Sequence, residues 1–103
     1  MIEIKPLSVN NAWKGRRFKT DAYKAYETEL LYKLPKLSVP SGALRIDLTF
    51  YFKNSLSDID NPVKPFLDIL QKKYGFNDRD IFELNVKKVV SKIEGIDFNI
   101  YEM

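Results

Sequence analysis

Four aspartates stand in two short runs of this sequence, where their carboxylates could act together on a phosphate group. Asp58 and Asp60 lie in the run SDIDNPVK, and Asp78 and Asp80 lie in the later run NDRD. Residues two apart on an extended chain point to the same side, so the carboxylates of Asp58 and Asp60 can converge. Convergent carboxylates repel each other unless a cation lies between them. Carboxylates that hold Mg²⁺ or Mn²⁺ are the arrangement that metal-assisted phosphoryl chemistry uses.

The same residues also fit an ordinary structural role. Asp-Asn-Pro ahead of a helix is common capping and turn chemistry, and NDRD is common loop composition. A calcium-binding loop fits less well, because the glycine and the glutamate that it needs at fixed offsets are missing. Spacing alone therefore favours capping, and the metal interpretation needs support from elsewhere in the chain.

Histidine and cysteine are both missing from the sequence, and their absence narrows the possible chemistry. It excludes a histidine-assisted nucleophile, a histidine general base and the usual catalytic zinc sites. The remaining oxygen donors suit hard cations, with Mg²⁺ as the expected cofactor and Mn²⁺ as a substitute. The lack of cysteine and of a membrane-spanning apolar run leads us to expect a cytoplasmic protein with no membrane partner.

Basic residues crowd the N-terminal third of the chain, although the net charge of the whole sequence is only +3. Trp13 and Phe18 are interleaved with them. Basic and aromatic side chains together predict an arm that grips DNA phosphates and stacks on unpaired bases. An exposed charged loop without a ligand is the alternative. The candidate DNA-binding residues are Lys14, Arg16, Arg17 and Lys19.

Hydrophobic periodicity predicts elements in the order β-α-β-α-β-β, within one domain that spans residues 1–103. The predicted strands cover residues 1–5, 43–53, 81–91 and 95–102, and the predicted helices cover residues 21–33 and 62–74. Residues 6–19 and 35–42 are expected to be loops. This order is typical of an α+β domain in which about four strands form a mixed sheet covered by two main helices.

Local signals mark the ends of both predicted helices. Thr20 is a good N-cap for the first helix, and Asn61 is a plausible N-cap for the second, with Pro62 at its first position. Gly75 is a natural stop for the second helix. Pro65 conflicts with this assignment, because a proline in or just after the first turn deletes an early hydrogen bond.

The second predicted helix would position the acidic residues. Asp58 and Asp60 precede its first turn, where free backbone N–H groups favour negative charge. Asp78 follows the end of the helix, so the chain can return it to the same end of the sheet. Lys64 falls in the first turn, either beside the acids or simply as a solvated lysine.

The runs DIDNPVKPFLDIL and YGFNDRDIFELNVKK resemble the signature of the RusA family of Holliday-junction resolvases. The family pattern is Asp-x-Asp-Asn, a following Lys, an amphipathic helix, and then Gly and an apolar residue that lead to an Asp and an Ile or Val. SVNN and GRRFKT near the N-terminus also resemble the family's opening. The matching residues are Asp58, Asp60, Asn61, Lys64, Gly75, Phe76, Asp78 and Ile81.

This resemblance implies a magnesium-dependent endodeoxyribonuclease that works as a homodimer. Its two metal sites would nick opposing strands of a four-way DNA junction. The resemblance carries over Asp58, Asp60 and Asp78 as metal ligands and Lys64 as the basic residue essential to cleavage.

The chain departs from the family pattern beside two of the aspartates. Where the family often has two acids in succession, Asn77 precedes Asp78, so Asp80 is the alternative third ligand. Ser57 stands where a basic residue can precede the first aspartate, which bears on junction affinity. Two other functions stay open: a non-catalytic module that binds branched DNA, and a nuclease of the same chemistry that cuts flaps or forks.

Overall fold

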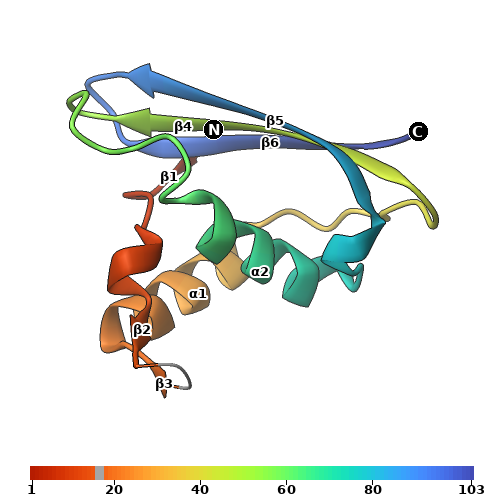
Figure 1. Ribbon diagram of the computed structural model, residues 1–103, viewed down its shortest axis with the longest axis horizontal. Helices are drawn as coiled ribbons and strands as arrows, with labels where there is room; N and C mark the ends of the chain where they lie inside the picture. Colours follow the sequence, from red (N-terminus) through yellow and green to blue (C-terminus); the bar gives the residue numbers. More distant parts are fainter. Residues whose placement is uncertain (16–17) are drawn as a thin grey trace.

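The computed structural model describes residues 1–15 and 18–103 of the chain. Its main elements are β1 Ile2–Glu3, α1 Asp21–Lys33, β4 Leu44–Phe52, α2 Val63–Tyr74, β5 Ile81–Val90 and β6 Gly95–Glu102. The strands form a four-stranded sheet in the order β1-β6-β4-β5, in which β4 pairs parallel with β5 and antiparallel with β6. Both α-helices cover the same face of this sheet (Figure 1). The predicted α+β domain with a mixed sheet and two helices is thus confirmed.

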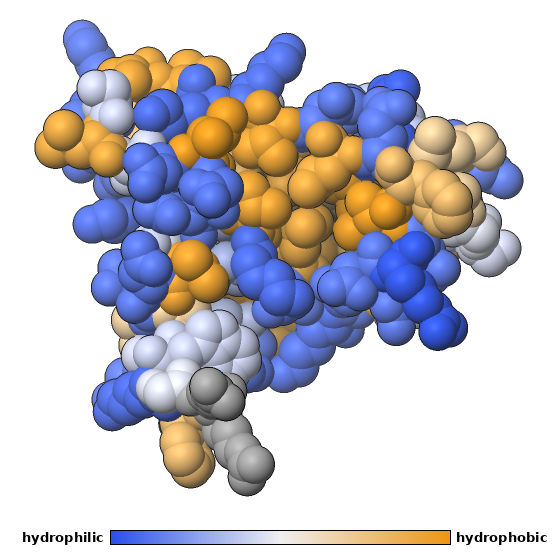
Figure 2. All heavy atoms as spheres, viewed as in Figure 1, coloured by the Kyte–Doolittle hydropathy of each residue, from blue (hydrophilic) through white to orange (hydrophobic). Residues whose placement is uncertain are grey.

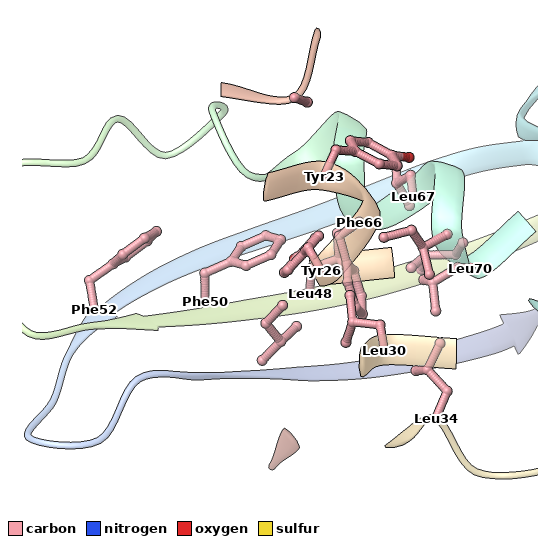
Figure 3. Packing of buried hydrophobic residues seen from close by; sticks show 14 residues of the cluster. Tyr23, Tyr26, Leu30, Leu34, Leu48, Phe50, Phe52, Phe66, Leu67 and Leu70 are labelled. Atoms are coloured by element: carbon pink, nitrogen blue, oxygen red, sulfur yellow. The ribbon is translucent and has the colours of Figure 1, made fainter. Parts of the chain in front are cut away.

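The core lies between β4 and the two helices (Figure 3). Residues of β4 alternate strictly, with Leu44, Ile46, Leu48, Phe50 and Phe52 buried on the helix side. From α1 the core receives Tyr23, Tyr26 and Leu30, and from α2 it receives Phe66, Ile69 and Leu70. Apolar residues at every second position of β4 thus pack against the apolar faces of the two helices, as the sequence pattern predicts.

Phe66 ties α2 to the sheet. Its side chain is fully buried and meets Phe50 of β4 edge-on, with 6.0 Å between the ring centroids. On its other side it meets Phe98 of β6 at 5.9 Å. Aromatic rings prefer such edge-to-face contacts, so these contacts set where α2 lies on the sheet.

One of the two predicted helix caps is confirmed. The hydroxyl oxygen of Thr20 accepts a hydrogen bond from the backbone N–H of Tyr23 at 3.1 Å. The predicted Asn61 cap is wrong, because α2 begins one residue late and Pro62 stands at its N-cap without a side-chain bond. The backbone carbonyl of Asn61 instead accepts from Val9 at 2.8 Å, which joins this turn to the N-terminal segment.

Pro65 does not disturb α2, for a reason that the sequence pattern left unresolved. It is the third residue of the helix, where backbone N–H groups have no partner inside the helix in any case. Gly75 ends the helix as predicted, in a left-handed conformation with φ of 75°. No helix in the described part of the chain is long and apolar enough to cross a lipid bilayer.

The N-terminal segment differs from the prediction. The first strand covers only Ile2–Glu3, because only these two residues pair with β6. The expected loop over residues 6–19 contains a 3₁₀ turn at Val9–Asn11 and a small antiparallel pair, β2 Trp13–Lys14 with β3 Phe18–Lys19. Such short strands carry too few residues for a period of two to be recognised in the sequence.

The outer edge of the sheet is unusually apolar. The strand at this edge is β5, which pairs with β4 on one side and with no other strand among the described residues. Leu84 lies opposite Ile46 and Val86 opposite Leu48, so both face the helix side. Even so, Leu84 is 39% exposed.

Candidate functional site

The loop between β4 and α2 carries two of the candidate acids. Asp58 and Asp60 are exposed and belong to a turn in which Asn61 N donates to Asp58 O at 3.3 Å. Val63 N then donates to Asp60 O at 3.1 Å as the chain enters α2. Both carboxylates therefore stand just before the helix, where its free N–H groups favour negative charge.

Lys64 lies between acidic side chains. Its ammonium donates to Asp68 Oδ1 at 2.8 Å and lies 3.8 Å from Asp78 Oδ2. The hydrogen bond to Asp68 raises the pKa of Lys64 above its usual range, against partial burial, which acts to lower it. This lysine is therefore not an isolated surface cation, as one of the two sequence interpretations had it.

Asp78 reaches Lys64 because α2 holds the following turn in place. The backbone N–H of Asp78 donates to Gln71 Oε1 at 2.9 Å, and Gln71 Nε2 donates to Leu67 O at 3.1 Å within the helix. Asp80 belongs to the same 3₁₀ turn, Asp78–Asp80. The ion pair with Lys64 is made by Asp78, so of the two candidate acids Asp78 is the one directed towards α2.

The structure brings Asp60, Lys64 and Asp78 to one region at the start of α2. Asp60 and Lys64 line the same groove, and Lys64 reaches across to Asp78. Across residues 1–15 and 18–103, however, no three acidic side chains are arranged as a closed set of metal ligands. The three predicted ligands thus lie in the two turns that flank α2, and they do not form a coordination sphere.

The donor chemistry of this region nevertheless suits a hard cation. Every candidate ligand is a carboxylate oxygen, the type that Mg²⁺ and Mn²⁺ prefer. The ammonium of Lys64 already occupies a position between Asp68 and Asp78, so the local field attracts positive charge. Asp58, Asp60 and Asp78 are exposed, which leaves their carboxylates able to turn towards an ion.

Asp68 is a site residue that the sequence interpretation did not single out. It stands one helical turn after Lys64, a spacing at which side chains on one helix face each other. Burial raises the pKa of the Tyr23 hydroxyl to about 12, and the charges of Asp68 and Glu27 add to the shift. The spacing of four from Lys64 within the predicted helix was the available signal, but such pairs are common on helix surfaces and did not single out Asp68.

The groove that contains Asp60 and Lys64 is otherwise apolar. It has a volume of about 350 Å³ and is completed by Ile59, Val63, Leu84 and Val86. Figure 2 shows hydrophobic surface at the centre of this face, between β5 and α2. The acidic turn therefore stands at the rim of an apolar surface formed by the loop, α2 and the sheet edge.

The predicted DNA-binding arm lies away from this groove, on the β2–β3 hairpin (Figure 1). Arg16 and Arg17 lie outside the described residues. Lys14 is exposed, and Phe18 projects from the hairpin with 71% of its surface exposed. Lys19 instead pairs with Glu27 at 3.1 Å, so part of its charge is used within the fold.

The electrostatics of Glu27 explain this use of Lys19. Burial alone acts to raise the pKa of Glu27, but hydrogen bonds from Lys19 and Lys72 outweigh it and lower the pKa. Lys72 Nζ lies 3.1 Å from Glu27 Oε1, so this carboxylate joins the arm, α1 and α2. Of the two described candidate cations, Lys14 is the better placed for a phosphate.

Comparison with protein families gives one match. The model of the family of endodeoxyribonuclease RusA matches residues 5–101, which is nearly the whole chain. No individual curated protein matches it. The matched range includes both acidic runs and Lys64, and we conclude that this chain belongs to the RusA endodeoxyribonuclease family.

Proposed function

We propose that this protein cuts four-way DNA junctions in a Mg²⁺-dependent reaction centred on the acidic turn before α2. Membership of the family makes the chain an endodeoxyribonuclease that acts on branched DNA. The finer proposal rests on one observation, the position of the Lys64 ammonium between Asp68 and Asp78 beside the groove that Asp60 lines. An exposed lysine held among acids fits a site where cations meet a phosphate.

Each residue of the turn has a distinct part in this proposal. Asp58, Asp60 and Asp78 supply the carboxylates that would hold Mg²⁺, which when bound activates water and neutralises charge on the phosphate. Lys64, the only charge of opposite sign in this set, orients the scissile phosphate and stabilises the charge that develops on it. The hairpin residues Lys14 and Phe18 bind DNA at a distance from the cut, through phosphate contacts and base stacking.

The first prediction concerns the cation. The full-length protein should nick a labelled four-way junction with Mg²⁺ or Mn²⁺ and should be inactive in excess EDTA. Ca²⁺ should support junction binding without efficient cutting, since its larger and looser ligand shell positions water poorly. Gel analysis of the products on junction, flap and fork substrates measures both activity and selectivity.

Three results would contradict this proposal in different ways. Full activity in excess EDTA would show that cleavage does not need a divalent cation. Binding to the junction with no cleavage under any divalent cation favours a non-catalytic branched-DNA module. Faster cutting of flaps or forks than of junctions assigns the same chemistry to another substrate.

The second prediction separates the two candidates for the third acid. Asp78→Asn should slow cleavage by more than about 100-fold, because losing a ligand removes several kcal/mol of charge stabilisation. Asp80→Asn is the matched control from the same turn and should cut at close to the wild-type rate. Single-turnover cleavage with saturating protein measures both. The reverse order of the two rates would move the third ligand to Asp80.

The third prediction tests the role of Lys64. Lys64→Ala should bind junctions within a few-fold of wild type, yet single-turnover cleavage should fall by ~10²–10³, as for other positioned electrostatic groups. Lys36→Ala removes the same charge from an exposed position in the loop after α1 and serves as the control. Equal cleavage rates for the two variants would make Lys64 an ordinary surface lysine.

We further propose that two copies of the chain form a homodimer through the apolar sheet edge. Paired cuts on opposing strands require two sites related by a two-fold axis. Leu84 and Ile59, 39% and 48% exposed, lie beside an unpaired strand edge, and such an edge commonly pairs with another chain. The second copy would thereby cover apolar surface that the helices leave open.

The fourth prediction follows from this interface. Light scattering at micromolar concentration should report a dimer for the wild type and a monomer for Leu84→Glu, because a buried unpaired charge is costly. Lys87→Glu, at an exposed position on the opposite face of β5, should remain dimeric. A wild-type monomer both free and bound to DNA would exclude the dimer, and a dimeric Leu84→Glu would place the interface elsewhere.

A further inference from the structure

Lys88 reaches from β5 to the loop that carries the acids. Its ammonium donates to the backbone carbonyl of Ser57 at 2.8 Å and to that of Ser55 at 3.2 Å. Ser57 immediately precedes Asp58, so the shorter of these bonds ends one residue from the acidic turn. A side chain from the edge strand β5 thus holds the backbone immediately before the two candidate acids.

A lysine is an unexpected residue at this position of the strand. Lys88 lies opposite the fully buried Phe50 and follows Leu84 and Val86 on the helix side of β5. An apolar side chain at this position would cover the core without the desolvation cost of an ammonium group. Across the part of the chain that the structure describes, its ammonium bonds to backbone carbonyls and to no carboxylate. Its polar contacts there are the two loop carbonyls, and charge-assisted bonds of this type are among the stronger ones.

The loop has few other attachments to the rest of the fold. At its start, Ser91 N donates to Phe52 O at 2.7 Å, and at its end Val9 N donates to Asn61 O at 2.8 Å. Residues 53–57 between these points form neither helix nor strand. Lys88 holds the middle of the loop, and with the Val9 bond it brackets Asp58 and Asp60 from both sides.

We infer that Lys88 is a positioning residue, which holds the 54–57 loop so that Asp58 and Asp60 are presented to a divalent cation. The inference rests on the proposed function, because it assigns those two acids to a cation. Its physical basis is pre-organisation: a loop already fixed loses less conformational freedom when its carboxylates close on an ion.

The test compares Lys88→Met with Lys87→Met in the full-length protein. Lys87 is the adjacent β5 residue, lies opposite Thr49 on the other face and is exposed, so the control loses the same charge without touching the loop. In Lys88→Met, amide hydrogen exchange should rise across residues 55–61 and stay unchanged in β4 and α2. Calorimetric Mn²⁺ affinity without DNA should fall about 10- to 100-fold, the usual cost of removing an outer partner of ligating groups. Lys87→Met should match the wild type in both measurements.

The possible outcomes separate this inference from the proposed function. If the wild type binds no Mn²⁺, the metal proposal fails, while loop exchange still tests the tether. If Mn²⁺ binds and both variants behave alike, the role of Lys88 is wrong and the metal proposal stands. A loss of junction affinity specific to Lys88→Met, with normal Mn²⁺ binding, makes Lys88 a DNA contact and overturns the inference.

A second measurement covers the case in which Lys88→Met does not fold. In the wild type, the ammonium protons of Lys88 should exchange slowly enough for detection by nitrogen-edited NMR, unlike those of the exposed Lys87. Lys88→Arg, which keeps the charge and the donors, should restore Mn²⁺ affinity to within a few-fold of wild type. Rapid exchange of the Lys88 ammonium, or no recovery in a folded Lys88→Arg, contradicts the tether.

Discussion

The packing of Phe66 against the sheet is the contact on which the arrangement of the site depends. Phe66 meets Phe50 and Phe98 edge-on and is fully buried, which fixes both the height and the rotation of α2 on the sheet. Lys64 stands two residues earlier, so its direction follows from this contact. The end of the helix is equally fixed, and Gln71 there holds the turn that presents Asp78. These two aromatic contacts thereby place on the sheet the helix that carries both Lys64 and Gln71.

The region of the acidic turn combines a rigid support with exposed functional groups. Ile69 and Leu70 bury the inner face of α2, while Lys64 stays exposed on its outer side. The carboxylates of Asp58 and Asp60 come from a loop, and loops are held by few bonds compared with helices and strands. The position of these carboxylates therefore depends on the few hydrogen bonds that hold the loop, which include those made by Val9 and Lys88.

The cationic and aromatic parts of the chain divide between two tasks. Lys19 and Lys72 hold Glu27 and so join the hairpin and both helices, whereas Lys14 and Phe18 are free to meet a ligand. Charge counts alone do not reveal this division, because a lysine in an internal ion pair and one facing solvent are identical in sequence. The family match over residues 5–101 makes the chain an endodeoxyribonuclease, and contact of Lys14 and Phe18 with DNA is our proposal.

Several elements were predictable from the chain because their signals are local. The alternation over β4, the stripe of α1 with its Thr20 cap, and the Gly75 stop each depend on neighbours within a turn or a strand pair. The acidic motif and Lys64 were also recognisable, since the family signature is written in short runs. The roles assigned to Asp58, Asp60, Asp78 and Lys64 remain predictions.

Other features were decided only by the tertiary structure, because they depend on which distant segments meet. The Asn61 cap was wrong: the helix starts one residue later, and the backbone carbonyl of Asn61 accepts from Val9 of the distant N-terminal segment. Asp68 pairs with Lys64 within α2, but only the tertiary structure brings this pair beside Asp78. In the sequence, Lys88 is one of several charged residues of a predicted strand. Only the parallel pairing of β5 with β4 brings its side chain to the acidic loop. Residue types and local spacing thus determined the elements and the candidate chemical groups of the chain, while contacts between remote segments determined which side chains lie together.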